Sequence, residues 1–359
     1  MSFRMFLLVP VFFLFGQNNL FGQNNISATE PIVVSSVKEY YINPVLESGA
    51  DPWIIKKGRN YYYCCVMDNG IGVAKWNALH IPAEPVKVWA APDSGWNSKC
   101  IWAPELHYLK GRWYIYYAAG FSGPPFIHQK TGVLESVSKN PMGAYTDKGM
   151  IYTGDTPEDS TSARWAIDMT VLEWKNKLYA IWSGWEKNET TDKTKQHLYI
   201  ALMDNPYTIS TARVMISTPD KDYETGPELN LNEGPQVLKH GKDLFIVYSC
   251  GQSWLDTYKL SLLRLKDESA DPLLPESWLK SDKPVFVGNE WAFGVGHASF
   301  TVSPNGKEWY ILYHSKKAKA PGWDRDVRLQ LFDWNQDGTP NFSTPVPKGL
   351  ILPAPSGSR

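Results

Sequence analysis

The chain has 359 residues, with 36 Lys and Arg, 37 Asp and Glu, and a formal net charge of −1. This balance of charge argues against a nucleic acid or another polyanion as the partner. Aromatic residues make up 14% of the chain, including 16 Trp; since Trp, Tyr and Phe favour strands, the excess suits an all-β core with aromatic side chains left over for a sugar-binding surface.

The first element that the sequence predicts, in chain order, is a secretory signal. One positive charge in residues 1–4 is followed by an apolar run from Met5 to Phe15. This run is shorter than the about 20 apolar residues that a membrane span requires. We therefore expect residues 1–25 to be a signal peptide and a polar spacer. We also expect the protein to be exported to the periplasm or the extracellular space, without a membrane span.

From residue 51 onward, the same pattern occurs five times. A polar residue opens a short apolar run, a turn follows, and a second apolar run returns, which is typical of a β-hairpin. The openers are Asp51, Glu105, Asp168, Glu233 and His297, at intervals of 54, 63, 65 and 64 residues. The turn residues, six to nine positions after the openers, are Gly58, Gly111, Asn176, Gly241 and Gly306.

A near-constant period built from short strands indicates radial repetition and excludes a helical solenoid. We predict an all-β fold, namely a five-bladed β-propeller with blades of about four antiparallel strands. One domain over residues 35–355 would form it. Since the innermost strands of a propeller surround one axis, the five openers are expected to meet at the mouth of that axis.

The four cysteines are Cys64, Cys65, Cys100 and Cys250, and they show no metal-ligand spacing. We interpret them as buried free thiols, with a disulfide as the alternative, because pairing cannot be deduced from sequence. Cys64 and Cys65 are adjacent in a predicted strand, so their side chains should point to opposite faces of the sheet.

Four of the openers are acids, and the fold prediction places three of them, Asp51, Asp168 and Glu233, face to face. Like charges at close range raise one another's pKa, so one of Asp51, Asp168 and Glu233 would stay protonated near neutral pH. A protonated acid beside an ionised base is what glycoside hydrolysis requires. A single acid before a strand is more often a solvated turn or cap, so the hypothesis depends on all three occurring at the same position of their repeats.

Five motifs, one per repeat, together resemble glycoside hydrolase family 43: Ala50-Asp51-Pro52-Trp53, Trp102-Ala103-Pro104-Glu105, Ile167-Asp168, Asn232-Glu233-Gly234-Pro235 and Gly294-Val295-Gly296-His297. The resemblance covers residues 45–335 and implies a five-bladed propeller with an inverting mechanism. It implies that Asp51 is the general base that activates water and that Glu233 is the general acid. Asp168 would orient the acid and set its pKa. An inverting site holds its acid and base about 6.5–9.5 Å apart.

Further residues are candidates for substrate binding. Trp102, Trp165 and Phe121 could stack on a sugar ring, although core or loop packing is the alternative for each. Glu105 is a weaker candidate, because a slip of one residue in register would turn its side chain to the other face of the sheet. Arg328 resembles the active-site arginine of the family, with an edge-strand surface arginine as the alternative.

His297 occupies the fifth opener position without a carboxylate. The resemblance implies that it lines the axial channel, contacts substrate and reaches a structural calcium or the waters of that calcium. A hydrogen-bonded core histidine is the alternative. No cofactor is expected to be required for the chemistry itself.

The motif from Trp102 to His107 and the segment around Arg328 are most similar to exo-acting α-L-arabinofuranosidases. The expected substrate is therefore an arabinose-containing plant polysaccharide or oligosaccharide, either arabinan or arabinoxylan. A β-xylosidase or an endo-1,5-α-L-arabinanase on the same site remains an alternative, and a non-catalytic carbohydrate-binding propeller is another. A retaining fructan hydrolase is disfavoured, because the sequence has neither an Asn-Asp-Pro-Asn-Gly opener nor an Arg-Asp-Pro element.

Overall fold

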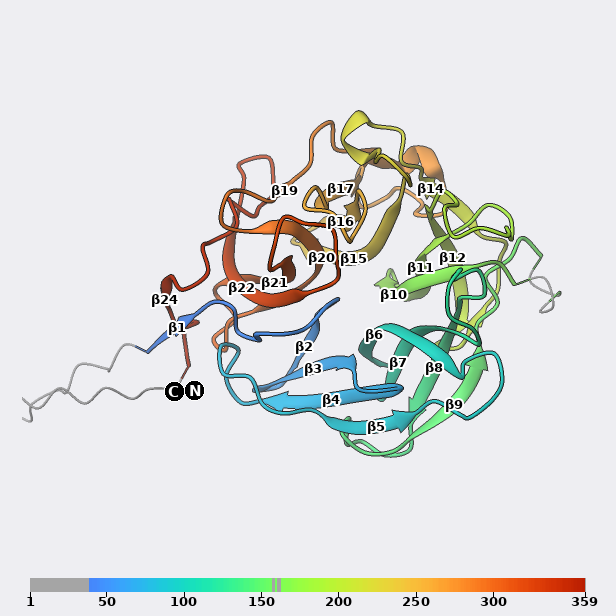
Figure 1. The fold of residues 1–359 in the computed structure, drawn as a ribbon, viewed down its shortest axis with the longest axis horizontal. Helices are drawn as coiled ribbons and strands as arrows, with labels where there is room; N and C mark the ends of the chain where they lie inside the picture. The colour runs from blue at the N-terminus through green and yellow to red at the C-terminus, as the bar shows by residue number, and fades with distance from the viewer. Residues whose placement is uncertain (1–38, 157–158, 160–162, 359) are drawn as a thin grey trace, which may run out of the picture. The chain divides into compact units, whose positions relative to one another are not determined.

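The computed structural model describes residues 39–156, 159 and 163–358. The chain divides into two compact units, residues 1–37 and 38–359, and the second contains every described element. It consists almost entirely of strands in five small antiparallel sheets arranged around one axis (Figure 1). The prediction of a five-bladed β-propeller is thus confirmed. The predicted signal peptide and spacer, residues 1–25, lie outside the described residues.

The five sheets follow the chain in order. Blade 1 consists of β2 (Trp53–Lys57), β3 (Asn60–Val66), β4 (Gly70–Trp76) and β5 (Val86–Ala90). Blade 2 consists of β6 (Lys99–Leu109), β7 (Arg112–Gly120), β8 (Lys130–Ser136) and β9 (Tyr145–Met150). Blade 3 consists of β10 (Ala166–Trp174), β11 (Lys177–Gly184) and β12 (His197–Asn205), with β13 (Thr208–Ile209) and β14 (Val214–Ser217) both paired to β12.

Blade 4 consists of β15 (Asn232–His240), β16 (Asp243–Cys250) and β17 (Lys259–Leu265), with β18 (Trp278–Lys280) and β19 (Phe286–Val287) both paired to β17. Blade 5 consists of β20 (Phe293–Val302), β21 (Trp309–Lys316), β22 (Arg325–Trp334) and β23 (Pro340–Asn341). The helical elements of the described residues are two 3₁₀ turns, η2 (Asp222–Glu224) and η3 (Pro275–Ser277). In the described part of the chain, no helix is long and apolar enough to cross a membrane.

The first two strands of each blade form the predicted hairpin. In blades 2 and 3 the loop has two residues, Lys110-Gly111 and Lys175-Asn176, and all four have positive φ. This is the backbone of a type I′ turn, whose twist matches that of the flanking strands. The turn therefore fixes the register, and with it the face on which each residue of the inner strand lies.

The inner strands of blades 2 to 5 are interrupted by a β-bulge at one common position. In each of these blades, two residues of the inner strand lie opposite one residue of the second strand. The first of the two residues has a positive φ. In chain order, these first residues are Ala103, Asp168, Gly234 and His297, and Asp51 has the same backbone conformation just before β2. A bulge bends the strand and re-aims a side chain. The structural repeat therefore corrects the predicted one: Glu105 lies two positions after the repeated site and Glu233 one position before it.

A hydrophobic cluster fills each interface between neighbouring blades. The five clusters join blades 1 and 2, 2 and 3, 3 and 4, 4 and 5, and 5 and 1. Much of the aromatic excess lies here, since Trp76 and Trp182 are fully buried. Cys64 packs between blades 1 and 2 and Cys65 between blades 1 and 5, so these adjacent residues do face opposite ways. All four cysteines are free thiols, and Cys64 and Cys250 are buried.

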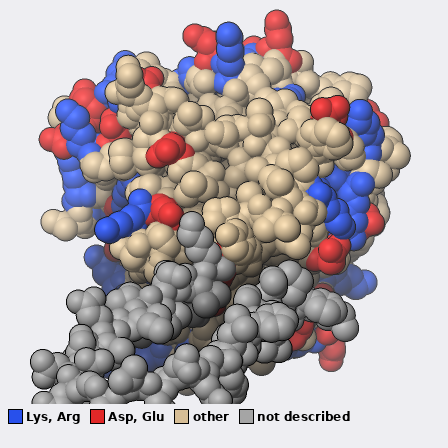
Figure 2. All heavy atoms as spheres, turned by 90° about the vertical axis from the view of Figure 1, so that its left-hand side faces the viewer, with Lys and Arg blue, Asp and Glu red and all other residues tan. Residues whose placement is uncertain are grey.

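No strand is shared between the first and last blades. Instead, the segment before blade 1 lies along the edge of blade 5. There β1 (Tyr40–Ile42) pairs with β24 (Ile351–Pro353), and Leu46 forms an antiparallel bridge with Val327 in β22. On the face shown in Figure 2, basic and acidic side chains are intermixed rather than gathered into a patch of one sign.

Candidate active site

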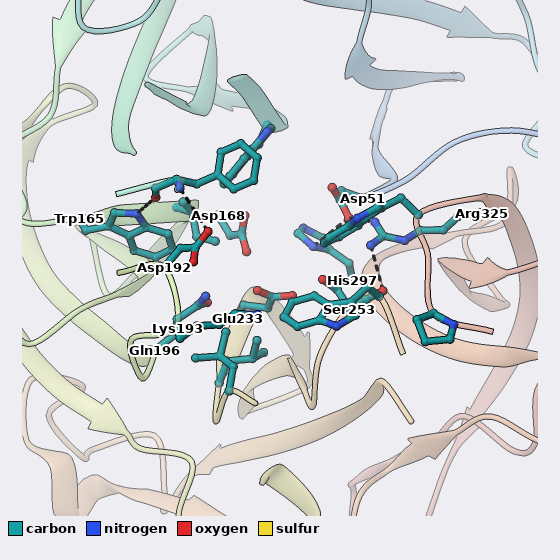
Figure 3. A pocket seen from close by; sticks show the side chains of 18 of the residues that line it. Asp51, Trp165, Asp168, Asp192, Lys193, Gln196, Glu233, Ser253, His297 and Arg325 are labelled. Carbon is teal, nitrogen blue, oxygen red and sulfur yellow. Dashed lines mark hydrogen bonds and ion pairs between the residues drawn. The ribbon is translucent and has the colours of Figure 1, made fainter. Parts of the chain in front are cut away.

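A cavity of about 770 Å³ lies where the inner strands converge, and residues from all five blades line it. Its lining includes the three predicted acids, Asp51, Asp168 and Glu233, together with His297. In Figure 3, Asp51 and His297 lie on one side of the cavity, Asp168 on the other, and Glu233 between them. Acids that are 182 residues apart in sequence (Asp51 and Glu233) thus share one pocket.

Asp51 is surrounded by nitrogen atoms from blade 5. Its Oδ1 lies 3.2 Å from His297 Nδ1, 3.3 Å from His314 Nδ1 and 3.6 Å from Arg325 Nη1. Burial by itself would raise the pKa of this carboxyl, but the histidines and Arg325 outweigh burial and lower the pKa below the ordinary value. The side chain keeps 26% of its surface exposed. Asp51 is therefore an ionised carboxylate that water can reach.

Glu233 has the opposite environment. It lies in β15 with 8% of its surface exposed, and its Oε1 accepts a 2.8 Å hydrogen bond from the Tyr258 hydroxyl. Burial and the negative charge of Asp51 raise the pKa of Glu233 to about 7, against the lowering effect of Tyr258. Glu233 therefore holds its proton over most of the acidic range, as a general acid must.

Asp168 is held against the strand that carries Glu233. The backbone N–H of Gly234 donates a 2.9 Å hydrogen bond to Asp168 Oδ2. Burial, and then the charges of Glu233 and Asp51, raise the pKa of Asp168 well above its ordinary value. Gly234 has φ of 55°, and a Cβ there would lie 3.1 Å from His297 Nδ1. A glycine at this bulge thus lets the inner strands of blades 3, 4 and 5 approach one another closely.

Two of the predicted aromatic residues line the cavity. Trp165 is 2% exposed, stacks on Trp185 with ring centroids 4.5 Å apart, and donates from Nε1 to the carbonyl of Phe126. Trp102 packs edge-on against the Phe126 ring at 5.0 Å. Together these side chains form a fixed aromatic wall on the blade 2 and blade 3 side.

Three predicted binding residues, Phe121, Glu105 and Arg328, lie outside the cavity lining. Phe121 is 49% exposed and stacks on His128, with centroids 4.1 Å apart. Glu105 is buried deeper in the ring, where its carboxylate lies 2.9 Å from His107 Nε2 and accepts a hydrogen bond from Gln236. The register explains this position, because Glu105 comes after the bulge in β6 rather than within it.

The arginine prediction needs a correction. Arg328 is buried and pairs with Asp326 at 2.8 Å, and its guanidinium donates to the carbonyls of Trp291 and Val346. Arg325 lines the cavity instead. Side chains alternate along a strand, so residues three apart in β22 point to opposite faces. Arg328 therefore supports the C-terminal segment, whereas Arg325 faces Asp51.

Sequence reasoning missed several side chains at the site. Two of them, His314 and Tyr258, touch Asp51 and Glu233 directly, and Trp323 lines the cavity. Counting residues back from the hairpin turn of blade 5 could have found His314, because it pairs with Gly296 across β20 and β21. No comparable signal marks Tyr258, which follows an irregular loop.

The donor set does not fit a calcium held by protein side chains. Calcium takes six to eight oxygen ligands, and the described residues contain no group of three or more His, Cys, Asp or Glu that could hold a metal. The Nδ1 atom of His297 is also engaged with Asp51. The predicted calcium near His297, reached through water, stays a prediction, and no step below depends on it.

Comparison with known proteins gives the family. The model of glycosyl hydrolases family 43 matches residues 41–340. The chain belongs to glycosyl hydrolases family 43.

Among the relatives of this family 43 chain, an extracellular exo-α-(1→5)-L-arabinofuranosidase of Streptomyces avermitilis is 36% identical over 324 residues. The α-L-arabinofuranosidase 43 of Humicola insolens is 34% identical over 326 residues. In both cases the match covers 86% of this chain but 64% of the relative, so the chain spans less than two thirds of their length. The crystal structure of an α-L-arabinofuranosidase from Lactobacillus brevis superposes with a TM-score of 0.78 at 34% identity, over 86% of this chain and 98% of that one.

Proposed function

We propose that this family 43 protein is a secreted, inverting glycoside hydrolase, an exo-acting α-L-arabinofuranosidase that releases arabinose from arabinan or arabinoxylan. The observation that carries the proposal is the opposite protonation of two carboxyls in one cavity: Asp51 has a lowered pKa and Glu233 a pKa of about 7. The names of the relatives from Streptomyces avermitilis and Humicola insolens support the choice of sugar, and the word extracellular in the former supports export.

The mechanism follows from these two states. Asp51 accepts a proton from water as the water oxygen forms a bond to the anomeric carbon of arabinose. The bond from that carbon to the leaving oxygen breaks, and Glu233 gives its proton to the leaving oxygen. The anomeric configuration inverts because water attacks the face opposite the leaving group. Asp168 contacts the strand of Glu233 through Gly234, so it positions the acid and its negative form would raise the acid's pKa.

The shape of the cavity favours exo action. Its volume of about 770 Å³ falls within the range of about 300–1,000 Å³ that is usual for small-molecule pockets. Loops from several blades border it, including the segments that carry Lys193, Trp254 and Trp323. An exo-acting enzyme needs a pocket that accepts the end of a chain, whereas an endo-acting enzyme needs a groove that is open at both ends.

The test uses an aryl α-L-arabinofuranoside as substrate and replaces the two reacting carboxyls. Asp51→Asn should lower kcat by at least about 10²-fold, because general base catalysis is lost, and Glu233→Gln should lower kcat/KM on substrates with poor leaving groups. The matched controls are Asp93→Asn and Glu268→Gln, both at exposed positions, which should leave activity unchanged. Activity of Glu233→Gln within a few-fold of wild type on linear arabinan would favour a carbohydrate-binding propeller.

Two further readouts separate the alternatives. A panel of aryl xylosides, aryl arabinofuranosides and linear arabinan, resolved by product chromatography, distinguishes xylosidase, exo and endo activity. NMR of the first-formed arabinose should show the inverted anomer. Retention would contradict the inverting mechanism while leaving the substrate assignment intact.

A further inference from the structure

The cavity has a second aromatic wall, which is exposed to solvent where the first wall is buried. Trp254 and Trp323 line it from blades 4 and 5, with ring centroids 5.6 Å apart and an angle of 47° between the ring planes. Trp323 is 63% exposed, whereas Trp165 of the first wall is 2% exposed. The first wall thus lies in the buried part of the cavity and the second at its rim.

A buried lysine joins the two loops that carry this rim pair. Lys316, at the end of β21, is 2% exposed, and its Nζ donates at 2.7 Å to the carbonyls of both Trp254 and Gly322. The backbone N–H of Gly322 also donates to the Trp254 carbonyl at 2.9 Å. Burying an ammonium is costly unless it is hydrogen-bonded, so Lys316 holds the blade 4 loop and the blade 5 loop in one arrangement.

Cations lie against both indole rings. The Arg325 guanidinium is 4.9 Å from the Trp323 ring centroid, and Arg325 donates to the carbonyl of Ser253 at 3.0 Å. Lys193 Nζ is 5.0 Å from the Trp254 ring centroid and pairs with Glu228. Cation–π contacts of this kind add to the fixed geometry of the rings. Trp323 is therefore held in place through both its loop and its indole ring, unlike an exposed side chain on an unsupported loop.

The rim pair also lies next to the general acid. Ser253, the residue before Trp254, lines the same cavity as Glu233, and so do Trp254 and Trp323. In an exo-acting enzyme, the sugar ring that carries the leaving oxygen lies on the solvent side of the arabinose that is released. The exposed rim pair is therefore the part of the lining placed to meet that ring.

We propose that Trp254 and Trp323 bind the sugar ring next to the arabinose that is released, so that the enzyme selects arabinose attached to another sugar over arabinose attached to a small alcohol. This inference rests on the proposed function, because it assigns the second ring of the same substrate. Apolar faces of furanose and pyranose rings stack on indoles, and a contact of this size changes affinity several-fold.

The experiment compares α-1,5-linked arabinobiose, which has a second ring, with methyl α-L-arabinofuranoside, which has none. Trp323→Ala should lower kcat/KM on arabinobiose about fivefold or more, mainly by raising KM, and change kcat/KM on the methyl glycoside less than about twofold. Trp323→Phe should restore most of the loss. The matched control is Trp291→Ala, which removes another exposed Trp, 55% exposed and outside the cavity lining.

The outcomes separate the two proposals. An equal effect of Trp323→Ala on both substrates, or no effect on either, would overturn the rim assignment. The proposed function would still stand in that case, because the wild-type protein cleaves the substrates. A wild-type protein that cleaves neither substrate contradicts the proposed function instead. In that event, calorimetric titration of arabinobiose into Glu233→Gln, with and without Trp323→Ala, still decides the rim assignment: unchanged affinity would overturn it, and weakened affinity would support it.

Discussion

The carboxyl groups of Asp51 and Glu233 titrate in opposite directions because their immediate neighbours differ. Nitrogen atoms of His297, His314 and Arg325 lie within 3.6 Å of Asp51 and favour its charged form. Glu233 is buried, and burial outweighs the hydrogen bond from the Tyr258 hydroxyl, so its neutral form is favoured. Two carboxyl groups therefore differ in pKa because of their environments alone.

This difference predicts how Tyr258 controls the pH dependence. Its hydroxyl stabilises the ionised form of Glu233, so Tyr258→Phe should raise the pKa of Glu233 further above about 7. Activity falls as the acid loses its proton with rising pH, so the alkaline limb of kcat/KM should move to higher pH, by about one unit. The measurement is the pH profile of kcat/KM on an arabinofuranoside.

Tyr248→Phe is the matched control for this experiment. Tyr248 is a buried tyrosine of the same blade, but its hydroxyl donates to Glu224, at 2.7 Å, rather than to Glu233. It should alter stability without moving the alkaline limb. A limb that stays in place in Tyr258→Phe, or that moves equally in both variants, would contradict the assignment of Glu233 as the titrating acid.

At this scale the sequence could identify the acids but not all of their partners. A carboxyl before an apolar run leaves a trace in the residue order, and three of them recur. The residue order does not distinguish Arg325 from Arg328, because both lie in β22 and only the pairing register decides which of them faces the cavity. Tyr258 lies in the loop before β17 and reaches Glu233 within blade 4, whereas His314 of β21 reaches Asp51 through the packing of blade 5 against blade 1.

The inner strands of blades 2 to 5 carry a bulge at one common position, and Asp51 has the same backbone conformation just before the inner strand of blade 1. Asp51, Asp168 and His297 all have left-handed backbone, with φ between 43° and 56°. This conformation costs residues other than glycine about 1–2 kcal/mol, and all three of these strained residues line the cavity. Sequence predicted the hairpins and their turns, but a bulge adds one residue without any compositional mark, so the exact repeat could not be seen.

Blade 2 tests this account, because its bulge carries Ala103, with φ of 40° and no functional group. Ala103→Gly should change the free energy of unfolding by between zero and about 1 kcal/mol in the stabilising direction, since glycine adopts this backbone without strain. The comparison is Ala180→Gly in β11, a fully buried alanine outside the bulges, which should destabilise by about 1 kcal/mol. Urea denaturation of both variants is the measurement. Equal losses in the two variants would mean that the bulge stores no strain.

Across the whole molecule, the ring is closed by side chains and by one short segment rather than by a shared strand. The N–H of Gly49 donates to the carbonyl of Arg325, and Val327 exchanges backbone hydrogen bonds with Leu46. The segment that ends at Asp51 is thereby fixed to the strand that supplies Arg325. The sequence predicted five blades but not this closure, because no residue type distinguishes a segment that lies along the last blade from an ordinary loop.

Asn43 is the residue on which this closure most depends. It is fully buried, its Nδ2 donates to the Leu329 carbonyl at 2.8 Å, and its Oδ1 accepts from the Leu329 N–H at 2.9 Å. Asn43→Ala removes the partner of the Leu329 N–H, while the Leu329 carbonyl keeps the Tyr41 hydroxyl at 3.1 Å, so the free energy of unfolding should fall by about 1–3 kcal/mol. Asn335→Ala, at an exposed turn where the amide bonds Thr339, should change it by less than about 0.5 kcal/mol.

Hydrogen exchange separates a local effect on closure from a general loss of stability. In Asn43→Ala, the amides of β22 that face the first segment, Val327 and Leu329, should exchange faster than those of β11, at the far side of the ring. Because Asp51 follows directly on that segment, kcat should fall as well, through a looser contact between Asp51 and Arg325. Uniform acceleration of exchange in every blade would show that Asn43 supports the fold as a whole and does not close the ring.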